Sequence, residues 1–158
     1  MRRLKWCFVL VGGLIILDQI LKNWASYVLA GRPNFFVLGH FFSLEFYRNH
    51  GIAFGIPLPP VAFYSIVALV CILLYYWGKK FWQKKDFSSL CALVFLGGGA
   101  FSNILDRIRF GYVIDYLNLA FWPVFNLADM MIIGGVVIIL IKAMRRKDNA
   151  KFKNQNAK

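Results

Sequence analysis

The stretch FNLADMMIIGGVVIILIKAMRRK, residues 125–147, decides the fold class. Its apolar run is long enough to cross a bilayer, which takes about 17–25 residues, and it ends in a basic cluster. Asp129 nevertheless lies about one helical turn inside the apolar part. An ionisable side chain at membrane depth costs about 2.5–3.5 kcal/mol, so such residues are usually functional. The stretch therefore predicts a membrane helix that carries part of a site.

Three further apolar segments of similar length precede this stretch. The chain has 158 residues, of which 59% are hydrophobic and 16% charged, and this is too apolar for a soluble domain. The four predicted spans are residues 6–29, 60–77, 87–108 and 123–144. They predict an all-α membrane protein with four transmembrane helices. Residues 1–147 form a single integral membrane domain, and residues 148–158 a polar, disordered cytoplasmic tail.

The basic residues predict the orientation of the spans. Most Lys and Arg residues lie before the first span, between spans two and three, or after span four. These segments share one side of a four-span protein, and the positive-inside rule makes that side cytoplasmic. We therefore expect a multi-pass protein with both termini in the cytoplasm. Because its basic residues are placed in this way, the net charge of +12 indicates no nucleic-acid partner.

Two loops then face outward. The first, residues 30–59, is rich in aromatic residues, and polar and apolar positions partly alternate between residues 40 and 49. The alternation predicts short strands in a small β-containing extracytoplasmic region. We expect this region to lie on the membrane surface, with its aromatic rings at headgroup depth. The second outer loop, residues 109–122, is short.

The cysteines and histidines indicate no further chemistry. Cys7, Cys71 and Cys91 show no CxxC spacing and have no neighbouring histidine, so we expect free, buried, unreactive thiols. Both histidines, His40 and His50, lie in the first outer loop. Because the sequence shows no cluster of metal ligands, we expect no metal and no cofactor.

Acidic residues gather toward the outer ends of the predicted spans. Asp106 and Asp129 lie in the outer halves of spans three and four, and Asp115 lies in the loop between them. Asp18 lies in the first span, and Lys22 follows four residues later on the same helical face, which predicts an ion pair. Two adjacent carboxylates at low dielectric cannot easily both ionise. A pair with one proton can activate water, as in aspartic proteolysis.

Two other classes of protein could carry acids at this depth. A proton-coupled transporter needs polar groups along a path through both leaflets, but the inner halves of these spans contain no ionisable acid or base other than thiols and tyrosines. A purely structural assembly protein is the other alternative. The sequence contains no HExxH or GxSxG motif, so carboxylates are the main catalytic groups available. We expect an ion pair with the adjacent Arg107 to keep Asp106 ionised.

Five short motifs resemble the bacterial lipoprotein signal peptidases, also called signal peptidase II, over nearly the whole chain. The motifs are DQILK at 18–22, RNHGIAFG at 48–55, GAFSNILDR at 99–107, VID at 113–115 and FNLAD at 125–129. Each motif is weak alone, but their order and their placement on four spans are specific. The sequence departs from the family's usual pattern at Ser102, where Gly is usual, and at Ile52, where Ala is usual. We expect Ser102 either to loosen helix packing or to add a hydrogen bond.

The resemblance implies an intramembrane aspartic endopeptidase of the bacterial cytoplasmic membrane, with its active site toward the outer leaflet. It implies that diacylglyceryl-modified prolipoproteins are cleaved before the lipidated cysteine, with Asp115 and Asp129 as the catalytic pair. Other residues match substrate-binding or site-shaping positions, namely Asp18, Lys22, Asn49, Gly51, Asn103, Asp106, Arg107 and Asn126. The expected partners are these substrates and membrane lipid, and we expect a monomer.

Overall fold

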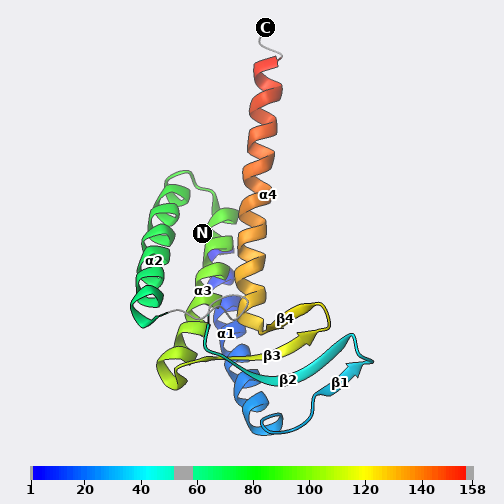
Figure 1. Ribbon diagram of the computed structural model, residues 1–158. Coiled ribbons are helices and arrows are strands. Elements are labelled where there is room, and N and C mark those ends of the chain that lie inside the picture. Colours follow the sequence, from blue (N-terminus) through cyan, green and yellow to red (C-terminus); the bar gives the residue numbers. More distant parts are fainter. Residues whose placement is uncertain (1, 52–58, 156–158) are drawn as a thin grey trace.

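The computed structural model describes residues 2–51 and 59–155 (Figure 1). Its four helices are α1 (Arg2–Val28), α2 (Pro60–Gln83), α3 (Phe87–Phe110) and α4 (Leu127–Gln155). Its four strands are β1 (Phe35–Leu38), β2 (Phe42–Asn49), β3 (Val113–Leu119) and β4 (Trp122–Phe125). The strands form one antiparallel sheet in the order β1-β2-β3-β4. Ile52, one of the two departures from the family pattern, lies outside the described residues.

All four helices are long and apolar enough to cross a membrane, which confirms the predicted spans. The fourth span differs at both ends. It begins at Leu127 rather than at residue 123, because the preceding residues pair with β3 as β4. It also continues as helix to Gln155, so the prediction of a disordered tail is wrong as far as that residue. No proline or glycine occurs between Gly135 and Gln155 to end the helix.

The central helix of the bundle is α3, which packs against each of the other three helices (Figure 1). Glycines allow α3 and α4 to approach closely, as small residues do between helices in lipid. A Cβ atom at Gly99 would lie 2.3 Å from the carbonyl oxygen of Ala128. A Cβ atom at Gly135 would lie 2.6 Å from the carbonyl oxygen of Ala92. Helix α2 contacts the bundle mainly through α3.

The sheet extends to one side of the bundle, from the end at which α1 and α3 finish and α4 begins (Figure 1). An apolar cluster attaches it to the end of α1, and the buried members are Ala25, Leu29, Ile114 and Tyr116. The strand predicted between residues 40 and 49 of the first outer loop is confirmed as β2, and β1 precedes that stretch in the same loop. The sequence predicted no strand in the short second outer loop, but β3 lies within it and β4 follows directly. Asp115 therefore lies on a paired strand and not in a loop.

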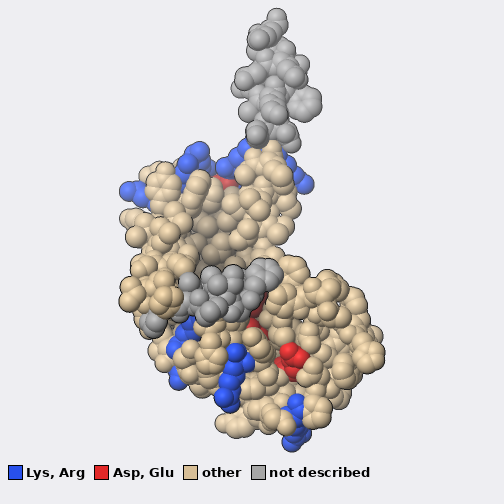
Figure 2. Space-filling model, viewed as in Figure 1, with Lys and Arg blue, Asp and Glu red and all other residues tan. Residues whose placement is uncertain are grey.

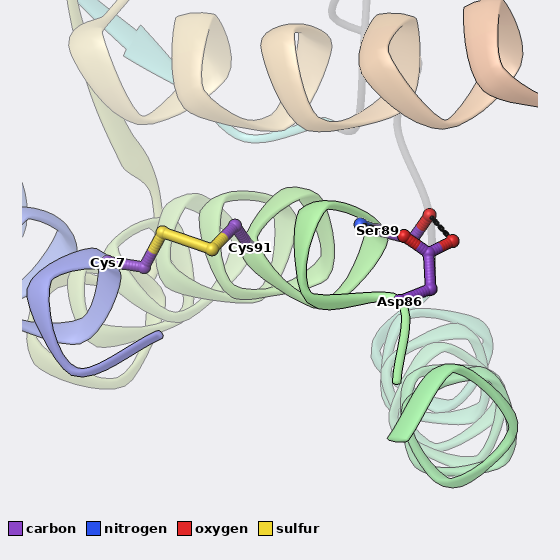
Figure 3. Close-up of a disulfide and its surroundings, with 4 residues drawn as sticks. All are labelled: Cys7, Asp86, Ser89 and Cys91. Atoms are coloured by element: carbon purple, nitrogen blue, oxygen red, sulfur yellow. Dashed lines mark hydrogen bonds between the residues drawn. A yellow bond between two sulfur atoms is a disulfide. The ribbon is translucent and has the colours of Figure 1, made fainter. Parts of the chain in front are cut away.

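At the opposite end of the bundle, Asp86 joins the start of α3 to α4. Its carboxylate accepts hydrogen bonds from the backbone N–H of Ser89, at 3.2 Å, and from the Ser89 hydroxyl, at 2.6 Å (Figure 3). It also forms ion pairs with Lys142 and Arg146. Burial alone would raise the pKa of Asp86, but hydrogen bonds from Lys142 and Ser89 hold that pKa well below its usual range.

The expectation of three free, buried thiols is wrong. Cys7 of α1 and Cys91 of α3 form a disulfide, with their Cα atoms 5.9 Å apart (Figure 3). Cys71 is free, but its side chain is exposed on α2. The paired cysteines are 84 residues apart in the sequence, so their proximity depends on how α1 packs against α3.

Adjacent glycines of α4 provide a test of the close packing. Gly135→Ala should lower the melting temperature in detergent, because its new Cβ atom would meet the backbone of α3. Gly134→Ala is the matched control, since no atom lies within 4 Å of a Cβ atom there. Alanine is favoured over glycine in a helix by about 1 kcal/mol, so the control should melt at the same temperature or higher. Equal melting temperatures for both variants would contradict the packing.

Candidate active site

A buried ion cluster lies behind the site, with Lys22 at its centre. The ammonium nitrogen lies 2.9 Å from a carboxylate oxygen of Asp18 and 2.9 Å from one of Asp106. Its third hydrogen bond goes to the Asn103 side-chain oxygen at 2.8 Å. Lys22 is 1% exposed, and both aspartates are 0% exposed. The predicted pair of Asp18 and Lys22 is confirmed, but the expected partner of Asp106 was wrong. Asp106 pairs with Lys22 and not with the adjacent Arg107.

Asp18 also holds the start of α4. One of its oxygens accepts hydrogen bonds from the backbone N–H of Ala128, at 3.2 Å, and from the Tyr116 hydroxyl, at 3.4 Å. The Tyr116 oxygen in turn accepts a hydrogen bond from the backbone N–H of Leu127. Burial, together with the charge of Asp18, raises the pKa of the Tyr116 phenol above its usual range. Sequence reasoning missed Tyr116, because nothing in a strand pattern identifies the partner of a buried hydroxyl.

Ser102 and Gln19 complete the cluster. The buried Ser102 hydroxyl donates to Asp18 at 2.7 Å, so this departure from the family pattern adds a hydrogen bond. The Gln19 amide nitrogen donates to the Ser102 hydroxyl, at 3.0 Å, and to Asp106, at 2.9 Å. Its side-chain oxygen accepts a hydrogen bond from Arg109. Gln19 was also missed, although a polar residue beside Asp18 within a predicted span was a detectable signal.

Asp129 lies in the first turn of α4, where it forms a reciprocal cap with Asn126. The backbone N–H of Asn126 donates to the Asp129 carboxylate at 3.2 Å. The backbone N–H of Asp129 donates to the Asn126 side-chain oxygen at 2.9 Å. Asn103 donates to the second Asp129 oxygen at 2.8 Å. Negative charge is favoured at this end of a helix, so one feature both starts α4 and positions a carboxylate.

Asp115 approaches the same place from β3. Its two oxygens accept hydrogen bonds from the side-chain amides of Asn126, at 2.6 Å, and Asn49, at 3.0 Å. Its side chain is 1% exposed. Burial, together with the negative charge of Asp129, raises the pKa of Asp115 to about 7. Asn126 thus contacts both Asp115 and Asp129, which places the two carboxylates side by side.

Arg107 holds the chain just beyond the end of β2. Its guanidinium donates to the backbone oxygen of Gly51 at 2.6 Å and lies 4.9 Å from the centre of the Phe63 ring on α2. The backbone N–H of Gly51 donates to the Asn49 side-chain oxygen at 3.0 Å. All eight residues expected to shape the site, including Asn49 and Gly51, therefore contact the carboxylate pair, the ion cluster or each other.

A cavity of about 730 Å³ opens beside the carboxylates. Its polar part consists of Asn49, Asn103, Arg107, Asp115 and Asp129. Apolar side chains of α2, α3 and α4 line most of the remainder. A substrate in this cavity would have its polar backbone near the carboxylates and its apolar part against the helices.

The arrangement is suited to acid–base chemistry at a carbonyl group. Two neighbouring carboxyl groups that share a proton can supply both a base for water and a donor for the carbonyl oxygen. Within residues 2–51 and 59–155, no cluster of three metal-ligating side chains occurs. The chemistry that these residues support is hydrolysis of a peptide bond by a carboxylate pair.

The ion cluster leads to a prediction about stability. Of the single substitutions in the ion cluster, Lys22→Met should lower the melting temperature most. It leaves two buried carboxylates without their cation, at a cost of about 3–5 kcal/mol. Adding Asp18→Asn should restore part of the melting temperature, since one of the unpaired charges is then removed. Thermal melting in detergent measures both effects. A double variant no more stable than Lys22→Met would show that the charges are not coupled.

The chain is similar to known proteins over most of its length. A family model described as signal peptidase (SPase) II matches residues 10–145. The lipoprotein signal peptidase of Moorella thermoacetica is 37% identical over 134 residues, which cover 84% of this chain and 89% of that protein. The lipoprotein signal peptidase of Staphylococcus aureus strain JH9 is 30% identical over 145 residues, with 89% and 88% covered.

Two solved structures of bacterial membrane enzymes, both obtained by the in meso method, share the fold. One has a TM-score of 0.77 and 26% identity, and the match covers 92% of this chain and 91% of that one. The other has a TM-score of 0.73 and 27% identity, with 88% and 92% covered. Because the family model and the relatives match most of its length, the chain belongs to the signal peptidase II family, the lipoprotein signal peptidases.

Proposed function

We propose that Asp115 and Asp129 are the pair with which this lipoprotein signal peptidase cleaves prolipoproteins, immediately before the diacylglyceryl-modified cysteine. The observation that carries the proposal is the bridge formed by Asn126, which contacts both carboxylates at the polar end of the cavity. Family membership makes the chain a peptidase whose substrates are prolipoproteins. The proposal adds the identity of the reacting groups.

The reaction follows from the shared proton. The ionised carboxylate takes a proton from water, and the water oxygen attacks the scissile carbonyl carbon. The protonated carboxyl group donates to the carbonyl oxygen, so a neutral tetrahedral intermediate forms. Collapse of this intermediate breaks the C–N bond, and the amine of the modified cysteine takes up a proton from the pair. The signal peptide leaves with a new carboxyl terminus.

The surrounding residues hold the reacting groups and the substrate. In this proposal Asn49, at the end of β2, and Gly51, just beyond it, contact the substrate backbone. The hydrogen bond from Arg107 to the Gly51 carbonyl supports this role, because it holds that backbone in place. The ion cluster, together with Asn103 and Asn126, holds the first turn of α4 and the facing strand β3. The lipid anchor confines the scissile bond to one plane of the membrane, which supplies part of the required positioning.

The orientation in the membrane is part of the proposal. Figure 2 shows basic side chains at both ends of this face, and those at the upper end lie around the α2–α3 connection and along α4. Over the whole sequence, most Lys and Arg residues lie at the start of α1, at the α2–α3 connection or in the last part of the chain. By the positive-inside rule, the upper end and both termini are cytoplasmic, and the carboxylates face the outer leaflet. Residues 1–147 then form one membrane domain, followed by a cytoplasmic tail. One chain supplies every proposed site residue, so a monomer, surrounded by membrane lipid, is sufficient.

Asparagine substitutions separate catalysis from support. Asp115→Asn and Asp129→Asn should each slow single-turnover cleavage by about 10²–10⁴-fold, because an amide cannot exchange the proton. Both variants should still bind a lipidated prolipoprotein. Asp106→Asn is the matched control, since Asp106 pairs with Lys22 and does not line the cavity. Asp106→Asn should lower the melting temperature but retain more cleavage activity than Asp115→Asn and Asp129→Asn. Normal cleavage by Asp115→Asn, together with an inactive Asp106→Asn, would assign the pair to Asp106 and Asp129.

The pH dependence of cleavage tests the shared proton. Because the pKa of Asp115 is raised to about 7, this carboxyl keeps its proton through mildly acidic pH and loses it above pH 7. The pair is then doubly ionised, so kcat/KM should fall above neutrality, toward about tenfold per pH unit. The measurement is kcat/KM from pH 5 to pH 9, with melting followed at each pH to exclude unfolding. A constant value from pH 6 to pH 9 would contradict the assignment.

A further inference from the structure

A second apolar cavity extends the first one away from the carboxylates. It has a volume of about 320 Å³ and lies among α2, α3 and α4. Val70 and Leu74 line both cavities, so the two adjoin, and we refer to them together as the groove. Trp77 and Phe81 lie at the far end, with their ring centres 5.6 Å apart. Lys80 lies 4.6 Å from the centre of the Trp77 ring and helps to hold this wall in place.

The depth of this second cavity restricts what can occupy it. At a rise of 1.5 Å per residue, Phe81 lies about 27 Å along α2 from Phe63, which contacts Arg107 beside the carboxylates. By the same rise, Leu93 lies about 21 Å along α3 from Arg107. Half of the hydrocarbon core of a bilayer is about 15 Å thick. The far part of the groove therefore lies beyond the midplane of the membrane.

Two parts of a prolipoprotein are apolar enough to enter the groove. The acyl chains are attached to the cysteine beside the carboxylates, and lipid chains of one leaflet end near the midplane. The apolar core of the signal peptide must cross the whole bilayer, so only this core reaches the far cavity. We infer that the second cavity binds side chains in the cytoplasmic half of the signal-peptide core and thereby selects among prolipoproteins. This inference rests on the function proposed above.

The physical basis of the selection is packing. A helix in lipid gains little by moving apolar surface from lipid to protein, so association depends on close contact between side chains. Large side chains in the inner half of the core, such as leucine, would fill the second cavity, whereas alanines would leave part of it empty. Figure 2 shows the face between α2 and α4 on which this groove opens.

Filling the cavity tests the inference. Leu140→Trp places a large ring in the second cavity, and Ile141→Trp is the matched control, because Ile141 does not line it. The substrates have the same residues around the cleavage site and the same diacylglyceryl group. They carry either leucines or alanines in the cytoplasmic half of the signal-peptide core. Wild type and Ile141→Trp should prefer the leucine substrate in kcat/KM by about three- to tenfold, at or below the lower limit of about tenfold that one methylene group gives in a hydrophobic pocket. Leu140→Trp should abolish this preference.

A third substrate, with leucines in the core but shortened acyl chains, distinguishes the two occupants. Its cleavage relative to the full-length lipid should be the same in wild type and Leu140→Trp. Leu93→Phe fills the cavity from α3 and replaces Leu140→Trp if that variant melts at a lower temperature than wild type. A preference for leucine that survives both filling variants, or an effect of filling on acyl length alone, would overturn the inference. If instead the proposed catalytic pair were wrong, Asp129→Asn would still cleave the prolipoprotein, so the two failures can be distinguished.

Discussion

The buried ion cluster of Asp18, Lys22 and Asp106 constrains the arrangement of the helices and strands around it. One ammonium group serves two carboxyl groups inside the bundle. Leaving such groups without partners in a low-dielectric environment costs several kcal/mol, and every remaining lone pair must find a donor. Those donors come from α1, α3, β3 and α4, and the cluster therefore fixes how these elements meet.

The ion cluster also explains why the two candidate catalytic carboxylates, Asp115 and Asp129, are held firmly and why their surroundings differ. Asp129 is held by the first turn of a long helix and by an asparagine that is itself bound to Lys22. Asp115 comes from a strand, and its donors among the described residues are the neutral amides of Asn49 and Asn126. Burial beside another carboxylate then keeps its proton near neutral pH. Packing thus produces a carboxylate pair that shares one proton. The charges around the pair determine up to which pH the proton is retained.

Packing in the membrane also creates the groove. Gly99 and Gly135 bring α3 and α4 into backbone contact, while α2 contacts the bundle mainly through α3. The space between α2 and α4 is consequently open along much of its length and lined by apolar side chains. An enzyme whose substrate arrives within the bilayer needs such a lateral opening. The polar residues at one end of the groove set where the bond is cut.

Some features of the protein could be predicted from the sequence alone, because they depend on local spacing. Hydropathy located the four spans, and the four-residue spacing of Asp18 and Lys22 predicted their ion pair. Contacts between distant segments could not be predicted in this way. Lys22, rather than the adjacent Arg107, pairs with Asp106, and Cys7 meets Cys91, because α1 packs against α3. Helical periodicity defines which face a residue lies on, but only the packing of helices far apart in the chain decides what that face meets.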